Sequence, residues 1–204
     1  MSKLLLTSNG FFTEQIKKQF LQLIDKEISN LKVSIITTAS LLKENNQYAR
    51  KAKKDFIQMG FHTIDFTDIE YDDPETLRKY DVIYICGGNP FHLLYHIKKS
   101  GCDLILKSLA NKNVIIVGVS AGAVILGPNI NIVNYFTPQI NTINLRDLTA
   151  LGLTDTYIFP HYDREDLFAN NAEKTIEDRI VAFETLNKCN VVRVSDNQSI
   201  LFKT

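Results

Sequence analysis

The sequence predicts an α/β protein whose doubly wound, mostly parallel sheet is flanked by helices. Over roughly the first 125 residues, short apolar runs rich in β-branched residues alternate with longer segments of helical periodicity, as in βαβ units. Two of the short runs end in glycine-rich turns, at Gly87-Gly88 and at Gly118–Gly122. Because parallel strands place their carboxyl ends at one edge of a sheet, where such folds bind ligands, we expect the functional site there.

The strands and helices of this pattern can be assigned in order. Apolar runs predict strands at Lys3–Thr7, Val33–Thr38, Thr63–Phe66, Asp81–Ile85 and Val114–Val117. Helices are predicted from the apolar stripes Phe12, Ile16, Phe20, Leu23 and Ile24, then Tyr48, Ala52 and Phe56, then Leu93, Leu94 and Ile97, and over Asp103–Ala110. Asp73-Pro74-Glu75 is typical of a further helix start, and Gly60 of a helix end.

The pattern becomes less regular after Pro128. Short strands or an excursion from the sheet are indicated by Ile130, Ile132, Ile140 and Ile143. A strand at Tyr157–Phe159 and a helix carrying Ile176, Ile180 and Phe183 are expected next. Val191–Val194 and Ser199–Phe202 then resemble a closing hairpin around Asp196-Asn197.

Composition favours one domain over residues 1–204 and excludes several classes of partner. The 204 residues are 45% apolar, and 23 basic residues balance 23 acidic ones. This balance argues against a charge-steered nucleic-acid partner. The apolar runs are too short for a signal peptide or a membrane span, so we expect a cytoplasmic protein without a membrane partner. Three cysteines without C-x-x-C spacing argue against a disulfide framework and a zinc site.

The turn Gly118-Val119-Ser120-Ala121-Gly122 has the Gly-X-Ser-X-Gly pattern of a nucleophile elbow. In such a turn, small flanking residues permit a sharp reversal that exposes the serine hydroxyl beyond the sheet edge. The following helix directs unpaired N–H groups at the site, where they would stabilise negative charge on a substrate carbonyl. The alternative is a packing turn in which Ser120 caps the helix.

A serine nucleophile needs a base, usually a histidine held by a carboxylate. His161 directly follows a predicted strand and is the candidate base, whereas His62 is remote from the expected site. His92 and His96 have an i,i+4 spacing that suits a metal, but no accompanying ligand is evident in the sequence, and we expect no metal.

Three aspartates are candidates for the carboxylate that holds the histidine. Asp163 and Asp166 are near His161 in sequence, while Asp196 lies in a predicted turn that could orient the imidazole. An aspartate beside an asparagine is also a common turn former. The residue pattern therefore leaves this choice open.

The turn after the predicted strand Asp81–Ile85 contains candidates for a different nucleophile and for a phosphate-binding loop. Cys86 could be a nucleophile, although a cysteine that ends an apolar strand is usually buried and inert. Gly87-Gly88 lacks the third glycine of a dinucleotide site and the lysine of a phosphate loop. A backbone N–H donor to an oxyanion suits it better.

The chain resembles the serine peptidase family of aspartyl dipeptidase (dipeptidase E) and cyanophycinase. The matching motifs are Gly87-Gly88-Asn89 followed by Phe91, then Gly118-Val119-Ser120-Ala121-Gly122-Ala123, then Pro160-His161, then Asp196. The resemblance implies a fold like class I glutamine amidotransferase domains, which is also flavodoxin-like. It implies Ser120 as nucleophile, His161 as base and then acid, and backbone N–H groups of Gly88 and Ala121 as oxyanion hole. Asp196 falls where the family often has Glu as the third member.

Two positions depart from the aspartyl dipeptidases. After Asn134 this chain has Tyr135 where they have Asp, and it has Ile176 where they have Arg. Loss of that arginine, a plausible partner for an acidic side chain, removes the basis for specificity toward N-terminal Asp. Arg164 and Arg179 could substitute, although each is also typical of a solvated surface residue. We expect Asn89 and Tyr135 to contact the substrate.

Together these observations predict a cytoplasmic serine peptidase that hydrolyses small peptides through an acyl-enzyme on Ser120, without metal or organic cofactor. It would be a monomer or a homodimer. The alternative is a non-catalytic ligand- or partner-binding domain that retains the amidotransferase-like fold. A flavodoxin-like redox domain is a third hypothesis, and it predicts a yellow protein.

Overall fold

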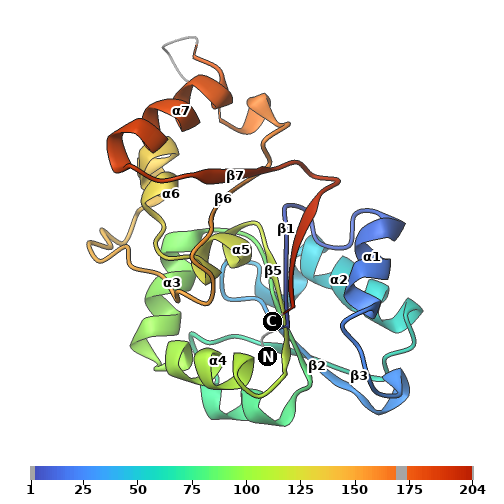
Figure 1. Ribbon diagram of the computed structural model, residues 1–204. Helices are drawn as coiled ribbons and strands as arrows, with labels where there is room; N and C mark the ends of the chain where they lie inside the picture. The colour runs from blue at the N-terminus through green and yellow to red at the C-terminus, as the bar shows by residue number, and fades with distance from the viewer. Residues whose placement is uncertain (1–2, 169–173, 204) are drawn as a thin grey trace.

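A six-stranded sheet lies at the centre of the computed structural model, which describes residues 3–168 and 174–203 (Figure 1). Its strands are β1 (Lys3–Thr7), β2 (Lys32–Ile36), β3 (Thr63–Thr67), β4 (Val82–Ile85), β5 (Ile115–Val119) and β8 (Ser199–Lys203). They lie in the order β3-β2-β4-β5-β1-β8, and all neighbours are parallel except the antiparallel pair β1 and β8. The predicted mostly parallel α/β fold is confirmed.

The central strands are apolar throughout because helices cover both faces of the sheet. Every residue of β4 and of β5 is buried. Successive side chains of a strand point to opposite faces, so Leu4 and Leu6 belong to one core cluster and Leu5 to the other. These two clusters are the two sides of a doubly wound sheet.

The helices divide between the two faces, as Figure 1 shows. One face is covered by α1 (Glu14–Leu21) and α2 (Gln47–Gln58). The other is covered by α3 (Pro90–Lys99), α4 (Cys102–Ala110) and α5 (Ala121–Leu126). In the described part of the chain, none of the helices is long and apolar enough to cross a membrane.

The buried stripe of α2 differs by one residue from the predicted one. Ala49, Ala52 and Phe56 are buried, whereas Tyr48 is 60% exposed. One residue along a helix rotates the side chain by about 100°, which turns Tyr48 off the core face. The helix begins at Asn46, whose side chain accepts a hydrogen bond from the Tyr48 N–H at 2.8 Å.

A smaller unit packs beside the carboxyl ends of the main strands. It contains α6 (Asn131–Phe136), β6 (Tyr157–Pro160), α7 (Ile176–Asn187) and β7 (Val191–Val194), and we call these four elements the lobe (Figure 1). β6 and β7 pair in parallel as a separate two-stranded sheet. The lobe has its own core cluster, formed by Ile132, Phe136, Phe159, Ile176, Ile180, Phe183 and Val191.

The predicted closing hairpin is wrong. β7 pairs with β6 in the lobe, and β8 pairs with β1 at the edge of the main sheet. The turn at Asp196-Asn197 therefore carries the chain from one sheet to the other. Two short apolar runs around a polar turn look alike in both arrangements. Here Val191 is buried in the lobe cluster and Val194 in a cluster of the main sheet, while β8 covers the otherwise open edge of β1.

The isoleucine-rich segment after Pro128 forms an excursion, but its residues are not strands. Helix α6 is followed by a short 3₁₀ helix at Pro138–Ile140. Within α6, Ile132 and Phe136 are four residues apart and bury the same helical face in the lobe. This packing outweighs the β-propensity of isoleucine, which depends strongly on context.

Gly122 allows α5 to pass close to β4, and this contact gives a first prediction. A Cβ at Gly122 would lie 2.3 Å from the carbonyl oxygen of Ile85. We expect Gly122→Ala to lower the free energy of unfolding by about 3 kcal/mol, as overpacking does when backbone must shift. Urea denaturation measures this change.

Gly101→Ala is the matched control for Gly122→Ala. Gly101 has a positive φ of 75°, but a Cβ there would meet nothing within 4 Å. The Gly101→Ala variant should lose only the backbone cost, about 1–2 kcal/mol, from its free energy of unfolding. Equal losses in the two variants would contradict the close approach of α5 and β4.

Candidate active site

Ser120 occupies a strained position between β5 and α5. Its φ of 49° and ψ of −112° lie in a region that non-glycine residues rarely adopt. Backbone hydrogen bonds fix this conformation: the Ser120 N–H donates to the Thr7 carbonyl at 2.9 Å, and the Ser120 carbonyl accepts from Ala123 at 2.9 Å and from Val124 at 3.0 Å. Such over-determined strain is a property of nucleophile elbows.

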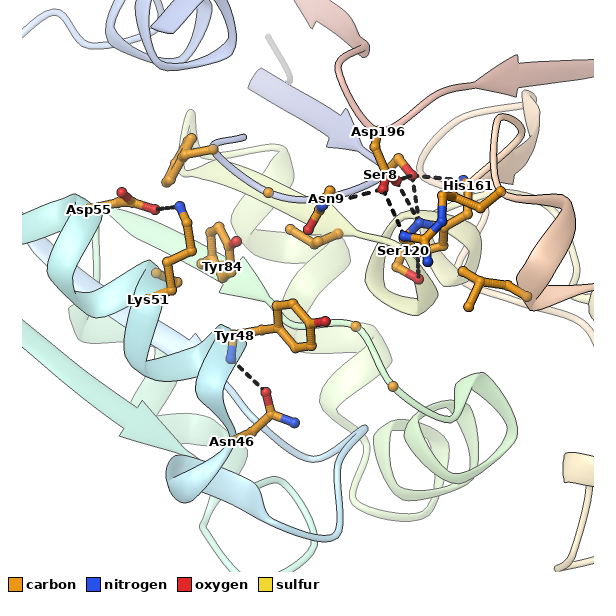
Figure 2. Close-up of a pocket in the computed structure, with 18 residues that line it drawn as sticks. Ser8, Asn9, Asn46, Tyr48, Lys51, Asp55, Tyr84, Ser120, His161 and Asp196 are labelled. Carbon is orange, nitrogen blue, oxygen red and sulfur yellow. Dashed lines mark hydrogen bonds and ion pairs between the residues drawn. The ribbon is translucent and has the colours of Figure 1, made fainter. Parts of the chain in front are cut away.

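His161 links Ser120 to a carboxylate (Figure 2). Its Nε2 lies 3.0 Å from Ser120 Oγ, and its Nδ1 lies 2.6 Å from Asp196 Oδ1. His161 directly follows β6 and has a positive φ of 58°. The structure thus brings Ser120, His161 and Asp196 into one hydrogen-bonded chain.

Asp196 lies in the turn between β7 and β8 and is buried. Burial raises the pKa of this carboxyl group, but hydrogen bonds from Ser8 and His161, with the charges of His161 and Arg164, outweigh it and hold the pKa below its usual value. Asp163 accepts a hydrogen bond from the Asp196 backbone N–H at 3.0 Å. Of the candidate carboxylates, Asp196 is the one that contacts the imidazole.

Ser8, directly after β1, is a member of the site that the sequence reasoning missed. Its buried hydroxyl accepts from the His161 backbone N–H at 2.7 Å and donates to Asp196 Oδ1 at 2.8 Å. Its neighbour Asn9 has its side-chain nitrogen 3.4 Å from Asp196 Oδ2. The available signal was position, since Ser8 ends a strand at the sheet edge where the site was expected.

Gly88 and Ala121 border the same space as Ser120. Gly88 has a φ of 143°, and a Cβ there would lie 2.3 Å from the Ala39 carbonyl oxygen. Ala121 is the first residue of α5, where backbone N–H groups have no partner within the helix. The pairing of β4 with β5 brings Gly88 beside Ser120, and Ala121 is the next residue after Ser120 in the chain.

Two cavities meet at Ser120, Gly88 and His161. The first extends toward α2, and its lining includes the polar residues Asn46, Tyr48, Lys51, Asp55 and Arg164 (Figure 2). Within it, Lys51 forms an ion pair with Asp55 at 2.6 Å. The second, of about 290 Å³, extends toward the lobe, and its described lining is mostly aliphatic and aromatic.

The side chains of Asn89 and Tyr135 contact other residues of the chain. The side-chain Oδ1 of Asn89 caps α3 by accepting from the Phe91 and His92 N–H groups, and its side-chain Nδ2 donates to the Ile140 carbonyl at 2.8 Å. The Tyr135 ring packs against Phe136 and Phe183, and among the described lining residues of the two cavities Tyr135 does not occur. Contact of Asn89 and Tyr135 with substrate stays a prediction.

Arg164 and Arg179, the candidate substitutes for the missing arginine, also contact other residues of the chain. The Arg179 guanidinium stacks on the Phe136 ring and donates to the carbonyls of Phe168 and Phe136. Arg164 forms two hydrogen bonds with Asp166 and lies 3.6 Å from Asp196 Oδ2. Arg164 is thus the one of the two that borders the cavity of the candidate site.

The rival nucleophile Cys86 is 6% exposed, and burial raises the pKa of its thiol to about 12. A thiol with so high a pKa carries negligible thiolate at neutral pH and is a poor nucleophile. Cys86 is therefore an inert core residue.

The family assignment follows from comparison with known proteins. The model of peptidase family S51 matches residues 4–204. The chain belongs to this family. It is 34% identical over 202 residues to an uncharacterized peptidase of Listeria monocytogenes, covering 96% of this chain and 94% of that protein. A crystal structure of a candidate peptidase E from Listeria monocytogenes EGD-e matches with a TM-score of 0.77 and 28% identity, over 99% of this chain and 94% of that one.

A more distant relative is named peptidase E. The chain is 29% identical over 135 residues to peptidase E of Shewanella amazonensis, covering 66% of this chain and 55% of that protein. As a member of family S51, the protein is a serine-type peptidase with a dipeptidase E-like fold.

Ser8 gives a prediction for the stability of the site. Ser8→Ala removes one acceptor and one donor, leaving the His161 N–H and the Asp196 carboxylate without them. Since hydrogen bonds to charged groups contribute about 1.5–3 kcal/mol, we expect the free energy of unfolding to fall by about that amount in urea denaturation. Ser29→Ala, at an exposed serine, should stay within about 0.5 kcal/mol of the parent. A Ser8→Ala loss no larger than this control would contradict the bridging role.

Proposed function

We propose that this peptidase hydrolyses small peptides through an acyl-enzyme on Ser120, with His161 as general base and Asp196 as the carboxylate that orients it. The observation that carries the proposal is the continuous chain of contacts, 3.0 Å from Ser120 Oγ to His161 Nε2 and 2.6 Å from His161 Nδ1 to Asp196 Oδ1. Both distances are within the reach that proton transfer requires.

In this mechanism Ser120 Oγ attacks the peptide carbonyl carbon while its proton passes to His161 Nε2. The carbonyl oxygen becomes an oxyanion, and the backbone N–H groups of Gly88 and Ala121 donate to it. When the C–N bond breaks, His161 returns the proton to the leaving amine. A water molecule then attacks the ester carbonyl while its proton passes to His161. The bond to Ser120 Oγ breaks, His161 returns the proton to Oγ, and the acid product leaves.

Asp196 has two roles in this scheme. Its hydrogen bond to Nδ1 holds the imidazole in the tautomer whose Nε2 can accept the Ser120 proton. Its lowered pKa keeps the carboxylate ionised, so that it stabilises the imidazolium formed in each half-reaction. Ser8 and Asn9 position this carboxylate from the side of the main sheet.

The second cavity favours a peptide with an apolar side chain beside the scissile bond. Val124, Val133, Phe136 and Phe159 are among its lining residues. Ile176, where the aspartyl dipeptidases have Arg, is buried in the same core cluster as Phe136 and Phe159. Among the described lining residues of this cavity there is no Lys or Arg, so an acidic side chain here would lose its hydration without gaining an ion pair with either, which is costly.

The nucleophile can be tested with a fluorophosphonate probe and with the carboxylate variant. We expect the probe to label the parent protein, and labelling to disappear in Ser120→Ala. Asp196→Asn should lower kcat by about 10⁴-fold, as loss of the triad carboxylate does in serine proteases. A Ser120→Ala variant that hydrolyses dipeptides at the parent rate would refute the mechanism. Absence of both labelling and hydrolysis in folded parent protein would favour a non-catalytic binding domain.

A dipeptide panel tests the preferred side chain. The panel varies each of the two positions among Leu, Ala and Asp, with Ser120→Ala as the background control. At one position, we expect kcat/KM to fall by about 100-fold or more from Leu to Asp, since burial of an unpaired carboxylate costs several kcal/mol.

Val133→Thr keeps the shape of the cavity but adds a hydroxyl, and it should lower kcat/KM for Leu more than for Ala. Equal rates for Leu and Asp at both positions would contradict the role of this cavity, while leaving the Ser120 mechanism intact.

A further inference from the structure

Three metal-ligating side chains gather on the α3 side of the sheet, outside the lining of both cavities at Ser120. His92 and His96 lie one turn apart on α3, and Glu70 reaches them from the segment after β3. Their candidate ligand atoms all lie within 4.8 Å of one another. His92 Nε2 is 3.4 Å from Glu70 Oε2, and His96 Nε2 is 3.9 Å from Glu70 Oε1.

His92 gives a second and independent observation. Among the residues that the structure describes, its Nε2 is a buried side-chain nitrogen without a hydrogen-bond partner. Buried polar atoms of this kind are rare and call for a partner that the coordinates lack, such as water or an ion. This nitrogen is directed to the same place as the Glu70 carboxylate, which a cation between them would explain.

We propose that Glu70, His92 and His96 form a binding site for Zn²⁺ or a similar divalent transition metal, separate from the catalytic centre. Two imidazoles and one carboxylate are a donor set that zinc takes, with water in the fourth position. Bonds of about 2.0–2.1 Å in a tetrahedron place ligand atoms roughly 3.4 Å apart. The two distances to Glu70 match this spacing or need a shift of less than an ångström.

Lys43 is the group that a metal would have to displace. Its Nζ binds Glu70 Oε2 at 2.5 Å and Asp68 Oδ2 at 2.9 Å. Because Asp68 remains as a partner, the ammonium can leave Glu70 without losing its ion pair. Lys43 and the metal therefore compete for one carboxylate, and removal of Lys43 should favour the metal.

The site would join α3, which carries both histidines, to the segment after β3, which carries Glu70. α3 begins directly after Gly88-Asn89, and the Asn89 N–H donates to the Ala39 carbonyl at 2.8 Å in the segment that also carries Lys43. A metal here would cross-link α3 to the segment after β3. We therefore expect it to stabilise the fold.

Metal-free protein, prepared with a chelator, should be titrated with Zn²⁺ in competition with a chromogenic chelator, and with Co²⁺ as a spectroscopic probe. We expect one equivalent to bind outside the triad, with the visible absorption of four-coordinate Co²⁺. His92→Gln and His96→Gln should each weaken Zn²⁺ binding by more than about 100-fold, beyond the usual cost of losing a supporting contact. His62→Gln, at an exposed histidine, is the matched control.

Two further variants keep the test decisive. His161→Gln removes the triad imidazole and should retain the bound equivalent. Lys43→Gln should bind Zn²⁺ more tightly than the parent, a gain that misfolding cannot produce. Zn²⁺ should raise the Tm of the parent and of Lys43→Gln but not that of His96→Gln.

Failure to bind micromolar Zn²⁺, unchanged binding in His92→Gln and His96→Gln, or loss of binding in His161→Gln would each overturn the proposal.

Discussion

The parallel pairing of β5 with both β4 and β1 is the constraint on which the site depends. The registers Ile85↔Gly118 and Thr7↔Val119 align the carboxyl ends of these three strands. Each strand then releases its chain at the same edge, and the residues that follow are Gly88, Ser120 and Ser8. The strained backbone of Ser120 persists because Thr7 on the neighbouring strand accepts its N–H. Sheet register thus sets the local geometry of Ser120, the proposed nucleophile.

The other half of the site comes from the lobe. His161 follows β6, and Asp196 follows β7, so the parallel pairing of these two strands brings the imidazole and the carboxylate together. Ser8 joins the two halves, since it contacts both His161 and Asp196 from the end of β1. A packing change between lobe and sheet would therefore alter the contacts of Ser8 with His161 and Asp196.

The sequence was most informative where one local pattern determines one structure. The alternation of strands and helices predicted the sheet, the Gly-X-Ser-X-Gly turn indicated Ser120, and the end of a strand indicated His161. Pairing between strands was less accessible, because it depends on packing between segments distant in sequence. The hairpin prediction failed for this reason. Isoleucine content likewise left open short strands or an excursion over residues 130–143, where burial in the lobe selects helix α6.

Residues supplied by distant segments were also missed for this reason. Ser8 lies 153 residues from His161 and 188 from Asp196 in sequence, and no local motif marks it. Glu70 lies 22 positions before His92, at the end of another strand, so the i,i+4 histidines showed no third ligand. The packing of these segments against one another in space was the missing information.

The connection of β7 to β8 through Asp196 has a consequence for biosynthesis. The proposed triad requires a turn near residue 8 to meet one near residue 196, so its contacts have very high sequence separation, and their formation carries a large loop-closure entropy. A nascent chain that has not yet produced β7 and the following turn lacks the carboxylate. In the proposed mechanism, hydrolytic activity therefore arises only when the tertiary fold is complete.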